Sequence, residues 1–188
     1  MSESNNQQLF TITVFSENTV GVLNQVTAIY TRRNINIESI TASICSIPNV
    51  SKFTLTSRSD RRTMEKVVQQ IEKRIDIIKA FLYTDDDIVY QEVALYKVPT
   101  QKLLEEKHLE WIIRKHAARI LEITPEYTVI EKTGHYDETA ALFEALKHYD
   151  IRQFARSGRV TITKDPFEYV TALLAERQPP IEDDSTHE

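Results

Sequence analysis

The chain has 188 residues, 41% of them hydrophobic and 27% charged, so it can bury a core and has the composition of an ordinary globular protein. Its net charge of −5 argues against a nucleic-acid surface, which is basic, and no stretch approaches the roughly 18 apolar residues of a membrane helix. The polar N-terminus does not resemble a secretory signal and the single Cys45 cannot form an intramolecular disulfide, so we expect a cytoplasmic protein.

The first half of the chain predicts the order strand, helix, strand, strand, helix, strand. Apolar residues alternate along the strands and recur at helical spacing in the helices, and Asp60 is placed to cap the second helix. The predicted elements are a strand over 9–15, a helix over 22–33, a strand over 35–44 with a bulge near Ser39, a strand over 52–57, a helix whose apolar stripe runs from Met64 to Ile75, and a strand over 75–83.

The second half repeats the same order after an acidic stretch at 84–87, which we interpret as a solvated linker. Its predicted elements are a strand over 89–98, a helix over 101–116, strands over 119–124 and 127–132, a helix over 137–149, and a strand over 151–163 that is interrupted at Ser157-Gly158. Two successive βαββαβ units predict an α+β protein made of two tandem ferredoxin-like sandwiches.

This pattern divides the chain into four segments. We expect a disordered N-terminus over 1–8, a first domain over 9–84, a second domain over 85–165, and a short helix with an acidic tail over 166–188. Charge is distributed unevenly between the halves, since residues 1–83 hold 10 basic and 7 acidic side chains and residues 84–188 hold 13 and 21. Such asymmetry fits two units.

The segment Glu17–Leu23 joins the first strand to the first helix and contains Gly21, one of only three glycines. The start of a helix leaves backbone N–H groups unpaired and carries partial positive charge, so it can hold a carboxylate or phosphate. Gly21 would let a ligand approach the backbone, and Asn18 would add a donor and an acceptor beside it. A tight turn without a ligand is the alternative interpretation of the same residues.

No constellation in the sequence indicates catalysis. The five histidines are scattered, and neither a dinucleotide fingerprint nor a phosphate loop is present. Arg156-Ser157-Gly158-Arg159 could hold an anion, but we interpret it as a strand break with two solvated arginines, and we expect Trp111 to lie in the core. The sequence therefore predicts a binding or regulatory protein with no catalytic or metal-binding residues.

Several stretches resemble the regulatory (small) subunit of acetolactate synthase, also called acetohydroxyacid synthase. The stretches are Glu17–Leu23, Arg32–Ser39 (RRNINIES), Ile75–Lys79, Glu92–Val98 (EVALYKV), Ile120–Thr128 and Ala155–Val160. They follow one another in order over about residues 9–163, in both predicted units.

The resemblance implies a non-catalytic subunit whose N-terminal ACT domain binds a branched-chain amino acid, usually valine, at the interface of a homodimer. It also implies an acetolactate synthase catalytic (large) subunit as partner, which carries thiamine diphosphate, Mg²⁺ and usually FAD. The small subunit itself would need no cofactor, would raise the partner's activity, and would confer feedback inhibition by valine in branched-chain amino-acid biosynthesis.

Combined with the helix-start argument, the resemblance implies a valine site. The ligand carboxylate would meet backbone N–H groups around Gly21, and amides from both protomers would bind its polar ends. The implied residues are Gly21, Val22 and Leu23 through their backbone, Asn18 and, across the dimer, Asn36 through their amides, and Val20, Val22 and Ile35 as walls for the isopropyl group.

Two positions depart from the family pattern. Asn34 replaces the usual Gly, and because Asn tolerates positive φ we expect the turn to survive. Val20 replaces a residue that is more often Pro or Ser, which would narrow the pocket.

Two other functions fit the same pattern. The first is a stand-alone ACT-domain protein that binds an amino acid and regulates another enzyme or transcription. The second is an RNA-binding ferredoxin-like module, which needs aromatic side chains on an open sheet face. Because Phe10 and Phe53 are predicted to face the core, the sequence disfavours the RNA-binding module.

Overall fold

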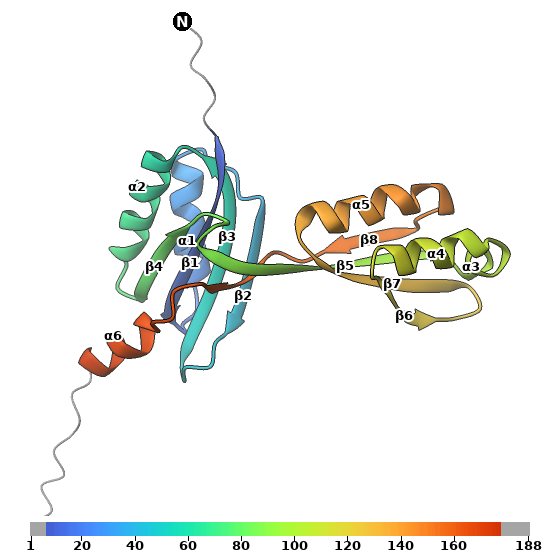
Figure 1. Ribbon diagram of the computed structural model, residues 1–188. Coiled ribbons are helices and arrows are strands. Elements are labelled where there is room, and N and C mark those ends of the chain that lie inside the picture. Colours follow the sequence, from blue (N-terminus) through green and yellow to red (C-terminus); the bar gives the residue numbers. More distant parts are fainter. Residues whose placement is uncertain (1–6, 178–188) are drawn as a thin grey trace, which may run out of the picture.

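The computed structural model describes residues 7–177, which form two antiparallel sheets with their helices (Figure 1). The elements of the first unit are β1 (Gln8–Glu17), α1 (Val22–Arg32), β2 (Ser39–Ile44), β3 (Val50–Ser59), α2 (Arg61–Glu72) and β4 (Ile77–Tyr83). Those that follow are β5 (Ile88–Pro99), α3 (Thr100–Glu105), α4 (Lys107–Lys115), β6 (Arg119–Ile123), β7 (Tyr127–Gly134), α5 (Tyr136–Leu146), the 3₁₀ turn η1 (Lys147–Tyr149), β8 (Gln153–Arg156), β9 (Val160–Thr163) and α6 (Tyr169–Arg177).

The first unit has the strand order β2-β3-β1-β4, with α1 and α2 packed on one face of the sheet (Figure 1). Alternate residues of β1, from Phe10 to Val14, are buried against the stripes of both helices. Asp60 caps α2 by accepting a 2.9 Å hydrogen bond from the Thr63 N–H. The predicted ferredoxin-like arrangement is confirmed for this unit.

The second unit repeats this order as β6-β7-β5-β8, so the tandem arrangement is confirmed as well. Its core joins Tyr96 and Ile130 of the sheet to buried leucines of α4 and α5. The predicted helix over 101–116 is wrong in one respect, because Glu106 has extended dihedral angles and separates α3 from α4.

Three local predictions from the first half are wrong, whereas the turn expected at Asn34 is confirmed. Residues 35–38 are not part of a strand, and β2 begins only at Ser39 and pairs with β3 without the bulge predicted there. Asn34, at φ 54°, ends α1 in a Schellman turn, in which the Ile35 N–H bonds to the Tyr30 carbonyl and the Asn34 N–H to the Thr31 carbonyl. Ile75 follows the end of α2 and is 96% exposed, so it does not belong to the apolar stripe.

The long strand β5 belongs to both parts of the molecule, as Figure 1 shows. Its second half pairs with β7 and β8 in the second sheet, whereas Ile88–Gln91 pair with β9. β9 contacts the face of the first sheet opposite the helices, where Thr161 meets Thr54 and its carbonyl accepts a bond from Lys52. Packing between the units therefore crosses the predicted boundary after residue 84.

The helix α6 packs on another part of this face. Val170 is 1% exposed and packs against Val50 and Ile78. The face does carry aromatic rings, but Phe81 contacts Tyr169 of α6, with ring centroids 6.1 Å apart. The surface that an RNA-binding sheet would use is thus occupied by the chain itself.

Parts of the predicted termini, residues 1–6 and 178–188, lie outside the described residues, and Gln8 already belongs to β1. Within residues 7–177, no helix is long and apolar enough to span a membrane.

Candidate functional site

The loop between β1 and α1 presents the start of a helix to solvent. Gly21 is the N-cap of α1 with φ 91° and ψ −8°, a left-handed conformation that favours glycine. Its carbonyl accepts the first helical hydrogen bond, from the Gln25 N–H at 3.1 Å. The N–H groups of the three residues between them have no helical acceptor. A Cβ on Gly21 would meet no atom within 4 Å, so the space above the loop is open in the described protomer.

Asn18 is held beside this loop by β3 and the turn before it. Its backbone N–H donates to the Asn49 carbonyl at 2.9 Å, and its Oδ1 accepts a 3.0 Å hydrogen bond from the Ser51 hydroxyl. Because Ser51 occupies one lone pair of Oδ1, the Asn18 amide is oriented before any ligand arrives. Its amino group remains available as a donor.

The three residues around Gly21 differ in exposure. Val20 is fully exposed, Leu23 is 38% exposed, and Val22 is 1% exposed within the first core. Val22 can offer its backbone N–H to a ligand, but the prediction that its side chain forms a wall of the pocket is wrong. Helical periodicity explains the burial, because Val22 lies on the same face of α1 as Val26 and Ile29.

The two remaining predicted residues lie at the other end of α1. Ile35 is half-buried against the first core and Asn36 is exposed. The 11 residues of α1 span about 16 Å at 1.5 Å per residue, so one protomer does not bring Asn36 to Gly21. Within one protomer the candidate site is therefore limited to Asn18, Val20, Gly21 and the backbone of Val22 and Leu23.

The edge strand β2 is a second exposed feature of this unit. It pairs only with β3, and Ile40 and Ile44 are 39% and 70% exposed on it. An edge strand with exposed apolar side chains is a template for pairing with another chain.

The junction between the two units holds a cluster of charges that the sequence analysis missed. Arg159 is only 3% exposed, so the prediction of two solvated arginines is wrong. Its Nη1 donates to Asp85 Oδ1 at 2.6 Å, its guanidinium lies 3.8 Å from the centre of the Tyr90 ring, and Glu92 is 3.6 Å away. The predicted solvated linker thus supplies Asp85, whose side chain is 48% exposed, to an ion pair with a buried arginine.

Arg156 joins the same cluster from β8. Its Nε lies 3.5 Å from Glu92 Oε2, and its guanidinium lies 4.0 Å from the Tyr136 ring centre. Glu92 is 6% exposed, so both arginines offset the charge of a buried carboxylate. The sequence signal for this cluster is the presence of charged residues beside apolar ones in two strands, Glu92 in β5 and Arg156 in β8.

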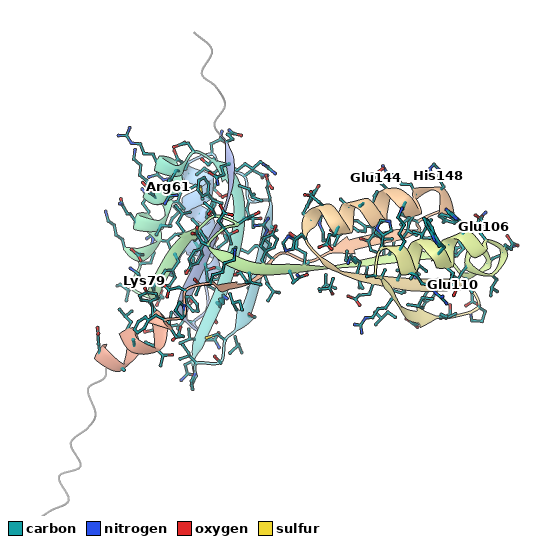
Figure 2. The ribbon with its side chains drawn as sticks, in the orientation of Figure 1. Arg61, Lys79, Glu106, Glu110, Glu144 and His148 are labelled. Carbon is teal, nitrogen blue, oxygen red and sulfur yellow. The ribbon has the colours of Figure 1, made fainter. Side chains whose placement is uncertain are left out.

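The second unit presents mostly locally paired charges. Figure 2 shows Glu110 on α4 and Glu144 on α5. Glu110 forms an ion pair at 2.5 Å with Arg114 on the same helix, and Glu144 forms one at 2.6 Å with Lys147, which follows α5 directly in η1. Trp111 is 51% exposed, stacked on His108 with ring centroids 5.0 Å apart, so its predicted place in the core is wrong. Residues 7–177 contain no group of three or more side chains able to hold a metal ion.

Comparison with known proteins agrees with both halves of this architecture. Residues 12–79 match the family described as "AHAS small subunit-like ACT domain", and residues 91–165 match "Small subunit of acetolactate synthase". The probable acetolactate synthase small subunit of Archaeoglobus fulgidus is 33% identical over 156 residues, which are 82% of this chain and 96% of that protein.

Two further relatives support the assignment. The acetolactate synthase small subunit of Bacillus subtilis is 31% identical over 159 residues, covering 84% of this chain and 91% of the relative. The crystal structure of the small subunit from Thermotoga maritima has the same fold, with a TM-score of 0.75 at 23% identity over 84% of this chain and 98% of that one. The chain described here therefore belongs to the acetolactate synthase small-subunit family, and its first unit is an ACT domain of that family.

Proposed function

We propose that this chain is the regulatory subunit of an acetolactate synthase, which activates the catalytic subunit and makes it sensitive to valine. The observation that carries the proposal is the open, glycine-capped start of α1 in the ACT domain of a small-subunit family member. An open helix start with unpaired N–H groups is suited to an amino-acid carboxylate.

The described residues support valine as the ligand. The carboxylate would accept hydrogen bonds from the N–H groups of Val22 and Leu23, and the second lone pair of Asn18 Oδ1 would accept one from the ligand's ammonium group. The exposed side chain of Val20 would contact the isopropyl group. A small apolar pocket discriminates a single methylene by only about 1–3 kcal/mol, so leucine and isoleucine are expected to bind more weakly rather than not at all.

A homodimer would complete this site. Pairing of two β2 edges would cover the exposed Ile40 and Ile44 and would let Ile35 and Asn36 of one protomer approach the Gly21 loop of the other. This arrangement accounts for the separation of the predicted residues along α1. It also gives a function to an edge strand that would otherwise favour aggregation.

The chemistry of the reaction would belong to the catalytic subunit. Thiamine diphosphate, Mg²⁺ and FAD are proposed for that partner, and no cofactor is proposed for this chain. The small subunit would act by binding valine differently in two states of the complex, for which coupling free energies of about 1–3 kcal/mol are typical.

The experiment that tests the proposal is acetolactate formation from pyruvate by the purified catalytic subunit of the same organism. Activity is measured with and without this chain across a valine titration, with D-valine as the stereochemical control. Activation of the catalytic subunit by this chain, followed by inhibition with L-valine but not with D-valine, supports both parts of the proposal. Activation without inhibition keeps the partner but rejects valine sensing, and no activation favours a stand-alone amino-acid-binding regulator.

A further inference from the structure

The segment between β8 and β9 contacts the sheet of the ACT domain at Gly158, and the contact leaves no room for a side chain there. A Cβ on Gly158 would lie 2.5 Å from Thr41 Oγ1 and 3.1 Å from the carbonyl group of Ile40. Both neighbours belong to β2. Glycine is therefore required here by the closeness of β2, and any displacement of β2 toward this segment must move the segment too.

The contact on the β2 side is steric rather than hydrogen-bonded. Thr41 Oγ1 is buried and has no hydrogen-bond partner within residues 7–177. Within one protomer β2 is held on one side only, by β3, so its position is less constrained than that of β1 or β3 and would respond to the proposed pairing with the β2 of a second protomer. An edge strand in van der Waals contact with a neighbouring backbone can pass small displacements on to that backbone, because packed contacts are close to incompressible.

On its other side the same segment is fastened to β5. The Ser157 N–H donates to the Val93 carbonyl at 2.9 Å, and the Val93 N–H donates to the Ser157 hydroxyl at 2.9 Å. Val93 already pairs with β7, and from Ala94 onward β5 pairs with β8 as well. Movement at Gly158 would therefore reach the central strand of the second unit through these two hydrogen bonds.

Arg159 fixes this segment to β1. Its Nη1 donates to the Thr11 hydroxyl at 3.2 Å as well as to Asp85. Because β1 is internal in the first sheet, Arg159 supplies a fixed reference point while Gly158 meets the edge strand. The two adjacent residues thus contact one constrained and one less constrained strand of the ACT sheet.

β2 is also the strand that follows the proposed ligand residues Ile35 and Asn36. We infer that Gly158, seated on Thr41 and Ile40, is the contact through which valine at the ACT interface alters the second unit and, through it, the catalytic subunit. This inference rests on the proposed function. The route runs from Asn36 along β2 to Gly158, then through Ser157 to Val93 on β5.

The experiment uses Gly158→Ala in the full chain, reconstituted with the catalytic subunit. We expect activation by the variant and its valine Kd, measured by calorimetry, to stay within about two-fold of wild type. At saturating valine, the activity that remains should rise about two-fold or more above that of the wild-type complex, because the variant weakens the coupling between the sites and leaves valine binding unchanged. Adding Thr41→Ala removes the atom nearest to the new methyl group and should restore much of the inhibition.

Gly134→Ala is the matched control, because the three atoms nearest to its new Cβ all belong to the side chain of Glu138, the closest of them at 2.8 Å. Thr11→Val is the second variant, since it removes the hydroxyl that accepts from Arg159 without adding bulk; it should also weaken inhibition while leaving valine binding intact. Melting curves of all variants show whether each one folds.

The possible outcomes distinguish failure of the inference from failure of the proposed function. If valine binds and inhibits the wild-type complex, and saturating valine inhibits Gly158→Ala and Thr11→Val to the same extent, the inference alone is overturned. A wild-type complex that valine does not inhibit overturns the proposed function, and the inference with it. Selective loss of inhibition in Gly158→Ala and Thr11→Val, but not in Gly134→Ala, supports the inference.

Discussion

Arg159 and Asp85 form an ion pair across the junction of the two units, with Nη1 2.6 Å from Oδ1. The arginine is 3% exposed while the aspartate side chain remains 48% exposed, so the pair links a buried site to the surface. Glu92, also buried, lies 3.6 Å from Arg159 Nε. The guanidinium of Arg159 thus offsets, together with that of Arg156, the charge of a carboxylate buried within the protein.

Replacing Arg159 with Met should destabilise the chain strongly. Removing one partner of a buried ion pair costs about 3–5 kcal/mol, because the remaining charge is left without compensation. Arg156→Met is the matched control, since Arg156 lies at a similar distance from Glu92 but its side chain is 25% exposed, and it should cost less. Urea denaturation measures both. Equal losses of unfolding free energy in the two variants would show that the burial of Arg159 does not determine its contribution to stability.

Gly21→Asp should abolish the response to valine. Both Asp and Asn reach positive φ more readily than most residues, so Gly21→Asn is an isosteric control that carries the same backbone strain without the charge. An aspartate beside the ligand carboxylate should raise the valine Kd at least ten-fold relative to the Asn variant, a difference of about 1.4 kcal/mol. Calorimetry on the isolated subunit measures this directly. Equal affinities of the Asp and Asn variants would place the carboxylate elsewhere.

Regular periodicity made most of the fold predictable. Strands such as β1 alternate apolar and polar residues, and α2 carries a clear stripe, so element order and the strand order of a ferredoxin-like unit followed from the sequence. The glycine-capped start of α1 was predictable as well, because few residues other than Gly adopt φ 91°. These features are local, and a single chain contains all the information for them.

The junction between the units was not predictable in the same way. On β9 the alternation is inverted, since Val160 and Ile162 are 62% and 65% exposed whereas Arg159 and Thr161 are buried. The reason is that β9 packs on a threonine-rich sheet face, which includes the buried Thr11 and Thr54. Hydropathy cannot distinguish a polar face that meets polar protein from one that meets water.

The proposed homodimer predicts a different effect for two exposed isoleucines. Ile44→Lys, on the edge strand β2, should convert the dimer to monomers because it places a charge in the pairing edge. Ile162→Lys is the control, since Ile162 is 65% exposed against 70% for Ile44 but lies on β9. Light scattering after size exclusion measures the mass. A dimer that survives Ile44→Lys would mean that β2 is not the contact between protomers.

Asn34 should contribute to stability through its backbone conformation alone. It is the left-handed residue of the Schellman turn after α1, at φ 54°. Asn34→Ala should cost about 1 kcal/mol, because alanine is strained at positive φ, while Asn34→Gly should be close to neutral or stabilising. Thermal unfolding of the wild type and the two variants measures their order of stability. If Ala were as stable as Gly here, the left-handed turn would not form in solution.

Lys52 should make stability depend on alkaline pH. Burial lowers the pKa of its ammonium group below the ordinary 10.5, while the Nζ donates to the Thr161 carbonyl on β9. Between the two pKa values the unfolded chain holds a proton that the folded chain has released, so folding stability rises with pH in that interval and levels off above about 10.5. Lys52→Met lacks this titration. The difference in unfolding free energy between wild type and Lys52→Met, followed by urea denaturation from neutral pH upward, should therefore shift in favour of wild type as pH approaches 10.5. A difference that stays constant with pH would mean that the amine remains solvated and that β9 does not cover this part of the sheet.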